Sequence, residues 1–201
     1  MVSHRSMPAR VAALCLTWVL VLAGPVAAEM QRFTVESDKS RAGFDAFHTF
    51  QNFSLASETP TGEIEADIAD LKQPIRGQVA VPAASLRSAD RKRDRAIHRT
   101  LDVEHHQEIR YRIDRVESSF TSLAENNDVL LTIRGVLTMR GESRPVDFSG
   151  RVRLRAGGSL WLRGESWIKP RDWGVDPIRI WLISVRENVL ATFDLILNKA
   201  Q

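Results

Sequence analysis

Apolar and polar residues alternate with a period of two between residues 128 and 155. One face of this segment carries Val129, Leu131, Ile133, Gly135 and Leu137, followed by Val146, Phe148, Gly150, Val152 and Leu154. Such alternation predicts two strands that each have one dry and one wet face. Arginines on the wet face exclude a parallel strand buried on both sides, so we expect an antiparallel sheet. Both arms exceed the usual strand length of about 5–6 residues, which suits a sheet that closes into a barrel with its dry face inside.

The same alternation recurs along the rest of the chain. It predicts strands over residues 31–37, 41–48, 62–68, 75–81, 109–117, 128–139, 145–155, 158–169 and 188–198. The first is short and either merges with the second or lies at an edge, which leaves eight main strands. Helical signals are few: one turn over 82–86, then a charged helix from Ser88 to Leu101 with Ala89, Ile97 and Leu101 as its apolar contacts. We therefore predict an all-β fold, an eight-stranded antiparallel barrel with one short flanking helix.

The inward-facing residues of the predicted barrel include many small side chains. An eight-stranded barrel is wide enough either to be filled by its own side chains or to hold a small ligand. The inward glycines fit a cavity or sharp bends of the strands equally well; they are Gly77, Gly135, Gly150 and Gly164. Inward alanines need no bend and favour a cavity. The residues expected to bind a ligand there are Phe44, Ala46, His48, Val79, Ile133, Phe148, Leu162, Ala191 and Phe193.

The N-terminal segment has the order of a secretory signal. Arg5 and Arg10 precede the apolar run 11–23, and the small residues 26–28 follow it. Charge, apolar core and small-residue end are typical of a signal peptide, and the run is short for a membrane span of about 20 residues. We expect residues 1–28 to be removed and residues 29–201 to form one domain in the periplasm or outside the cell. The single cysteine, Cys15, would leave with the signal.

The net charge gives no case for nucleic-acid binding. The chain has 28 Lys+Arg and 25 Asp+Glu, and loss of Arg5 and Arg10 would leave 26 against 25. A local basic run spans residues 91–95 and is interpreted as the solvated start of a helix, with an anion or phosphate site as the alternative.

Catalytic and metal-binding patterns are weak. No nucleophile elbow, phosphate loop or His-Glu metal helix stands in the sequence. His98, His105 and His106 are near one another in the chain, but adjacent histidines of an extended segment point to opposite faces, and zinc needs three or four converging ligands. We therefore expect no metal, no cofactor and no enzymatic activity. His48 is interpreted either as a polar residue at the barrel mouth or as a donor to a ligand headgroup.

Tryptophans fall outside the predicted lumen. Trp161 and Trp167 have the outward parity of their strand, and Trp181 follows in an irregular stretch. Outward aromatic residues usually pack under a loop; exposed, they mark a homodimer interface or a membrane-surface contact.

Four motifs in order resemble the YceI-like family of secreted, lipocalin-like, polyisoprenoid-binding proteins. They are residues 42–48 (AGFDAFH), 85–97 with Arg93-Asp94, 135–146 (GVLTMRGESRPV) and 172–177 (DWGVDP). The resemblance covers residues 32–198. It departs over residues 100–109, a stretch shorter than the common family form with Gln107 where many members carry proline. The resemblance implies an extended eight-stranded barrel that holds a long isoprenoid or acyl chain in its lumen.

Three functions remain open from the sequence. The leading hypothesis is a carrier or store for an amphiphile with one long apolar chain, such as a polyisoprenoid, an isoprenoid quinone or a fatty amide. The alternatives are an enzyme that uses the lumen as active site with His48 as base, and a ligand-free stress or accessory protein that acts through its tryptophan surface. A long apolar chain gains about 0.8 kcal/mol per buried methylene, so it needs no strong polar anchor.

Overall fold

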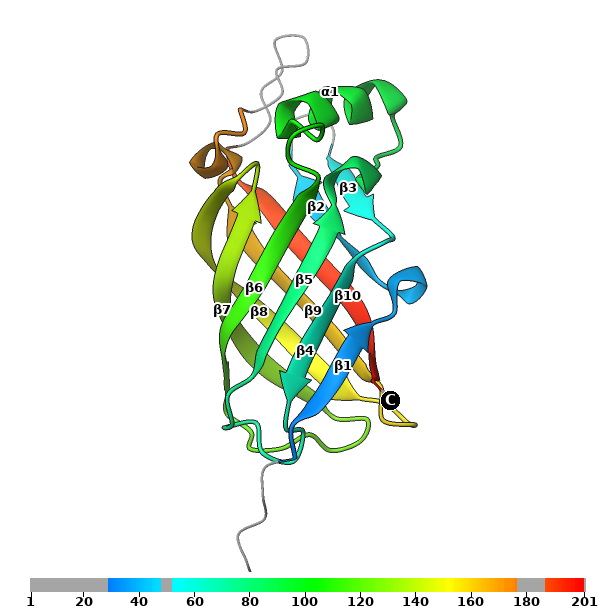
Figure 1. The fold of residues 1–201 in the computed structure, drawn as a ribbon, viewed down its shortest axis with the longest axis vertical. Helices are drawn as coiled ribbons and strands as arrows, with labels where there is room; N and C mark the ends of the chain where they lie inside the picture. The colour runs from blue at the N-terminus through cyan, green and yellow to red at the C-terminus, as the bar shows by residue number, and fades with distance from the viewer. Residues whose placement is uncertain (1–28, 48–51, 177–186, 201) are drawn as a thin grey trace, which may run out of the picture.

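The computed structural model describes residues 29–47, 52–176 and 187–200. Within these ranges the chain forms one antiparallel sheet and one α-helix (Figure 1). The elements are β1 (Gln31–Val35), η1 (Ser37–Lys39), β2 (Arg41–Ala46), β3 (Phe53–Ser57), β4 (Thr61–Ala66), β5 (Arg76–Pro82), η2 (Ala83–Ser85), α1 (Arg91–Leu101), β6 (Glu108–Ser118), β7 (Asp128–Met139), β8 (Glu142–Leu154), β9 (Leu160–Ile168), η3 (Pro170–Trp173) and β10 (Val189–Lys199).

The sheet closes on itself as an eight-stranded antiparallel barrel, as predicted. Its strand order is β1-β4-β5-β6-β7-β8-β9-β10, and the pairing of β10 with β1 closes the ring. The other part of β10, from Val189 to Asp194, pairs with β2, which in turn pairs with β3. Closure leaves few unpaired backbone groups at strand edges, which are sites of unwanted association.

The chain interrupts its strands at two places in the N-terminal part of the barrel. The chain breaks between β1 and β2 at η1, and between β3 and β4 at Pro60, and the Ser37 hydroxyl donates to the Pro60 carbonyl over 2.7 Å. This corrects the predicted strand list, in which the first two strands might merge and β3 was missing. The five residues of β3 are too short for alternation to separate them from a loop.

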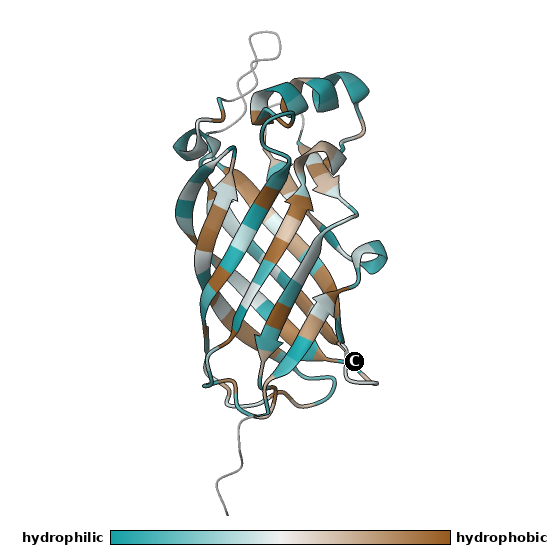
Figure 2. Ribbon diagram, in the orientation of Figure 1, coloured by the Kyte–Doolittle hydropathy of each residue, from teal (hydrophilic) through white to brown (hydrophobic). Residues whose placement is uncertain are grey.

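Inward and outward residues follow the predicted parity. Figure 2 shows apolar and polar residues alternating along the strands, and the buried core includes Ile133, Phe148, Leu162, Ala191 and Leu195. The glycines, however, do not open space inside the barrel, because neighbouring atoms occupy the positions that their side chains would take. At Gly164 that neighbour is the ring of Phe193, 2.5 Å from an ideal Cβ. At Gly135 the neighbours are the carbonyl oxygen of Arg112 and, at 2.8 Å, the side chain of Tyr111.

Helix α1 lies across one end of the barrel (Figure 1). It begins after Asp90, whose carboxylate accepts from the backbone N–H of Lys92 (2.7 Å) and Arg93 (3.2 Å), a typical N-cap. Ile97 and Leu101 are buried as predicted, but Ala89 is exposed and precedes the helix. Because the cap fixes the helix start at Arg91, the expected apolar contact of Ala89 was wrong. No helix of the described residues is long and apolar enough to cross a membrane.

The outward tryptophans differ from each other. Trp161 is half-buried on the outer wall, where its Nε1 donates to Asp194 over 2.6 Å. Trp167 is 58 % exposed and contacts the Phe47 ring, with 5.3 Å between centroids. No loop of the described residues buries Trp167, contrary to the interpretation that outward aromatic residues pack under loops. Trp181 lies outside the described residues.

Candidate functional site

The interior of the barrel contains three apolar cavities in series. The first, of about 110 Å³, lies beneath α1 and is lined by Ile97 and Leu101. The second, of about 70 Å³, occupies the middle and shares Phe44 with the first. The third, of about 50 Å³, lies toward the opposite end and shares Ile133 and Leu162 with the second. The cavities therefore mark one path along the barrel, from the mouth under α1 to the far end.

The size and lining of these cavities distinguish the interior from a packed core. Protein cores contain few voids larger than a water molecule, and a water needs about 10–15 Å³ of such space together with polar partners. Each cavity exceeds that space severalfold. In the described residues the middle cavity has a single ionisable lining side chain, that of Tyr111. Such a space favours an apolar ligand over water.

The far end of the barrel is closed by loops. Ile68, Leu71 and Leu123 line the third cavity there. Two backbone hydrogen bonds tie these loops together, from Leu71 N–H to Thr121 O (2.7 Å) and from Leu123 N–H to Ile68 O (2.9 Å). The mouth end is different, because polar residues stand among the apolar ones: Thr100, Asp176 and Glu187 also line the first cavity. The surface of the first cavity is nevertheless almost wholly apolar, like that of the other two.

Three aromatic rings form a ladder across the middle cavity. Tyr111 packs edge-on against Phe148 with 4.9 Å between centroids, and Phe148 lies 5.3 Å from Phe193. Phe193 and Tyr111 rest where Gly164 and Gly135 have no side chain. The rings are therefore held against the sheet, and the lumen beside them stays open.

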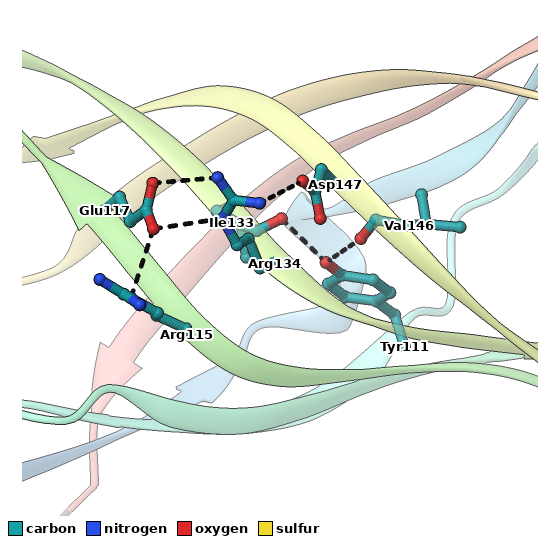
Figure 3. Close-up of polar contacts among 7 residues, drawn as sticks. All are labelled: Tyr111, Arg115, Glu117, Ile133, Arg134, Val146 and Asp147. Carbon is teal, nitrogen blue, oxygen red and sulfur yellow. Dashed lines mark hydrogen bonds and ion pairs between the residues drawn. The ribbon is translucent and has the colours of Figure 1, made fainter.

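The Tyr111 hydroxyl finds its hydrogen-bond partners within the sheet of the barrel (Figure 3). It donates toward two backbone carbonyl oxygens, that of Val146 at 2.8 Å and that of Ile133 at 3.0 Å. Burial raises the pKa of Tyr111 well above its usual value, and the carboxylates of Asp147 and Asp114 add to the effect. Tyr111 therefore stays neutral and presents its ring, rather than a charge, to the lumen.

The outer face of the same strands carries an ion-pair network. Arg134 contacts Glu117 at 3.2 Å and Asp147 at 3.0 Å, and Arg115 contacts Glu117 at 3.3 Å (Figure 3). Exposed pairs of this kind contribute little to stability, because water and salt screen them. They keep the outside wet while the inside stays apolar.

The predicted ligand-binding residues gather at these cavities. Seven line the middle cavity: Phe44, Val79, Ile133, Phe148, Leu162, Ala191 and Phe193. Phe44 and Ala46 line the cavity at the mouth. His48 lies outside the described residues. The role of these residues in binding stays a prediction.

Sequence reasoning missed part of the mouth. Met139, Val175, Leu55 and Pro170 also line the first cavity. Val175 and Pro170 belong to an irregular segment where no alternation marks an inward side. The four-residue spacing of Ile97 and Leu101 did indicate an apolar helix face. The helix was expected to plug or flank an open end of the barrel, and these two residues line the cavity at the mouth.

The histidines make local contacts instead of a shared site. His98 Nε2 lies 2.9 Å from Leu86 O, and His105 Nδ1 lies 2.7 Å from Asp102 Oδ1. His106 Nε2 also lies 3.9 Å from Asp102 Oδ2. The segment turns over residues 102–105, so the opposite orientation expected of adjacent histidines in an extended segment does not apply to it. The hydrogen bond to Asp102 raises the pKa of His105 and lowers that of Asp102. In residues 29–47, 52–176 and 187–200 no three His, Cys, Asp or Glu side chains are grouped as metal ligands.

The family model of the YceI-like domain matches residues 33–197. The chain belongs to the YceI-like family. Its match spans all strands of the barrel except the ends of β1 and β10, and it confirms the resemblance drawn from the motifs. No curated protein matches the chain by sequence.

Solved structures with the same fold have little sequence identity to this YceI-like chain. One is a polyisoprenoid binding domain from Saccharophagus degradans implicated in plant cell wall breakdown: 12 % identity, 84 % of this chain and 98 % of that chain covered, TM-score 0.68. Another is Burkholderia cenocepacia BcnA, with 17 % identity, 81 % and 98 % coverage, and TM-score 0.66. The Campylobacter jejuni YCEI protein matches with 14 % identity, 71 % and 81 % coverage, and TM-score 0.55.

Proposed function

We propose that this protein binds a single long apolar chain, an isoprenoid or acyl chain of an amphiphile, within its barrel. The observation that carries the proposal is the series of three apolar cavities that runs from the mouth under α1 to the closed end. A path that is narrow, extended and apolar fits one flexible chain better than a compact ligand. The similar fold of a polyisoprenoid binding domain supports the same ligand class.

Binding without catalysis is the activity that this lining supports. Tyr111 is held neutral with its hydroxyl engaged by backbone carbonyls, so it offers no general base. The acidic mouth residues Asp176 and Glu187 stand at the rim, where they fit contact with a headgroup or with water. A headgroup would thus remain near α1 while the apolar chain enters the barrel.

Export is part of the proposal. The order of charge, apolar run and small residues over residues 1–28 is typical of a secretory signal. We infer that the mature domain works in the periplasm or outside the cell, where an amphiphile has to cross water between membranes. A protein that shields the apolar chain would serve as its carrier or store.

A chain-length series tests the proposal. Calorimetric titration with geraniol and with farnesol compares ligands that differ by one isoprene unit. Because each buried methylene contributes about 0.8 kcal/mol, we expect farnesol to bind at least about tenfold more tightly. Equal affinity, or no binding of either alcohol, would contradict binding along the lumen.

A further inference from the structure

A second hollow lies outside the lumen, between β3 and the start of α1. This groove has a volume of about 620 Å³, and its lining residues include Arg87, Arg93, Ser54 and Ser88. Its charged and hydroxyl-bearing lining contrasts with the apolar cavities inside the barrel. The basic run over residues 91–95, for which the sequence left an anion site open, contributes only Arg93 to the groove.

The wall of the groove is fixed by backbone pairing. The segment between η2 and α1 pairs with β3 through two hydrogen bonds of 2.9 Å, Ala56 N–H to Arg87 O and Arg87 N–H to Ala56 O. The Arg87 guanidinium donates to the carbonyls of Leu86, at 2.9 Å, and Ala84. Its Nη1 also lies 3.0 Å from His98 Nε2. Arg87 is thus held against β3, while the residue as a whole is exposed.

Arg93 lies in the groove and contacts a residue that also lines the lumen. Its guanidinium carbon lies 4.3 Å above the centroid of the Phe53 ring, a cation–π distance. Phe53 lines both the groove and the cavity beneath α1. On α1, Arg93 also precedes Ile97 by four residues and shares its inward side. One aromatic ring therefore separates a cationic group from the mouth of the apolar path.

The carboxylate of Asp90, the N-cap of α1, interacts with Arg93: its pKa is lowered by hydrogen bonds from the backbone N–H groups of Arg93 and Lys92 and by the charges of their side chains. Within the described residues neither Arg87 nor Arg93 forms an ion pair, whereas arginines of the barrel wall such as Arg134 do. The groove also contains Arg41 and Glu58, which lie toward the other end of β3. Glu58 follows Phe53 by five residues, roughly 16 Å along an extended chain. The end of the groove next to the mouth therefore carries excess positive charge.

We propose that this end of the groove binds a phosphate-type anion, the headgroup of the amphiphile whose apolar chain lies in the barrel. The inference rests on the proposed function, and it narrows the ligand class from any long-chain amphiphile to one with an anionic head. Guanidinium groups are well suited to phosphate oxygens because they offer several N–H donors in a planar fork. Ser54 lines the same groove and adds a hydroxyl group to its polar surface, whereas the hydroxyl of Ser88 donates to the Asp94 carboxylate over 2.7 Å.

Titration of farnesyl phosphate and farnesol into the purified protein tests the inference. At low salt we expect the wild type to bind the phosphate at least about tenfold more tightly than the alcohol, because two arginines contribute charge-assisted hydrogen bonds. Arg93→Gln should reduce that preference to about twofold or less, with farnesol affinity kept. Arg93→Lys should retain an intermediate preference, since it keeps the charge but loses the planar fork.

Two controls make the outcome specific to the groove. Arg95→Gln removes a neighbouring exposed cation of α1 that does not line the groove, and it should leave the preference unchanged. High salt should lower the preference of the wild type without any substitution, because charge interactions are screened. If Arg93→Gln does not fold, as judged by thermal unfolding, the salt dependence of the wild-type preference for farnesyl phosphate still tests the inference.

The contradicting results separate this inference from the proposed function. Equal binding of farnesol and farnesyl phosphate by the wild type, or a preference unchanged in Arg93→Gln, would overturn the headgroup site and leave the lumen proposal standing. Binding of neither ligand would overturn both. Inorganic phosphate serves as a third probe: saturation of the groove by inorganic phosphate, without preference for farnesyl phosphate, would show a free-anion site and overturn the headgroup assignment.

Discussion

Substitution of two inward alanines by leucine separates an open lumen from a packed core. Ala191 lines the middle cavity and Ala46 the cavity at the mouth. Both are nearly inaccessible to solvent, at 4 % and 6 % exposure. In a tightly packed interior each Ala→Leu change would cost about 1–3 kcal/mol of the free energy of unfolding. In an open lumen the added carbons enter existing space.

The size of the gain follows from the cavities. Leucine adds three carbon atoms, worth about 2.4 kcal/mol at about 0.8 kcal/mol each. Filling the 70 Å³ middle cavity gives an independent value of about 1.7 kcal/mol, at about 24 cal/mol per Å³. Loss of side-chain rotamer freedom offsets about 0.5–1 kcal/mol. We therefore expect the apo form of Ala191→Leu to gain about 0.7–1.9 kcal/mol in the free energy of unfolding.

Thermal unfolding of the apo protein and farnesol titration are measured together. For a domain of this size 1 kcal/mol shifts the Tm by about 2–4 °C. The double variant Ala46→Leu/Ala191→Leu should keep or raise the Tm and lose farnesol affinity. The matched control is Ala83→Leu, a residue of η2 that is 1 % exposed and lines none of the three lumen cavities. That control should lower the Tm and leave binding unchanged. A Tm loss in the double variant equal to that of the control, with farnesol binding intact, would refute the open lumen.

Three further predictions concern other parts of the chain. Protein recovered from the periplasm should have an intact mass that corresponds to a chain starting at or within a few residues of Glu29, and a species that retains residue 1 would contradict export with cleavage. Replacement of Arg91, Lys92 and Arg95 by Gln should leave farnesol affinity within about tenfold, since these exposed charges are screened beyond roughly 8 Å; a loss of several hundredfold would contradict it. Tyr111 is the single tyrosine, and because its pKa is raised in the folded state, the folded protein should show no tyrosinate absorbance at a pH just above the usual tyrosine pKa of about 10. Its stability should fall as pH rises through that range, where unfolded tyrosine ionises, and Tyr111→Phe should remove that part of the pH dependence.

The alternation of side chains is sufficient to predict the barrel and most of its lining. Strands such as β7 and β8 are long, so a period of two is unambiguous over Val129 to Leu137 and assigns each residue to the inside or the outside. Alternation alone therefore assigned Ala191 and Phe148 to the inside of the barrel, and both line the middle cavity.

Other features depend on tertiary contacts that no local pattern encodes. The break in the wall at η1 is accompanied by a hydrogen bond from the Ser37 hydroxyl to the Pro60 carbonyl, 23 residues apart. Gly164 was interpreted as a bend or an opening, but its missing side chain accommodates the ring of Phe193 on a neighbouring strand. The groove beside α1 combines residues from β3, the segment after η2 and the helix. Its charge could be read from the sequence, but its position next to Phe53 could not.

Mass spectrometry of an organic extract from the protein purified out of its native compartment tests the central claim most directly. If the barrel binds one long apolar chain, the extract should contain about one isoprenoid or acyl-chain amphiphile per protein molecule, and the Ala46→Leu/Ala191→Leu variant prepared in the same way should contain far less. An extract without such a lipid, from protein that also fails to take up farnesol, would contradict the claim.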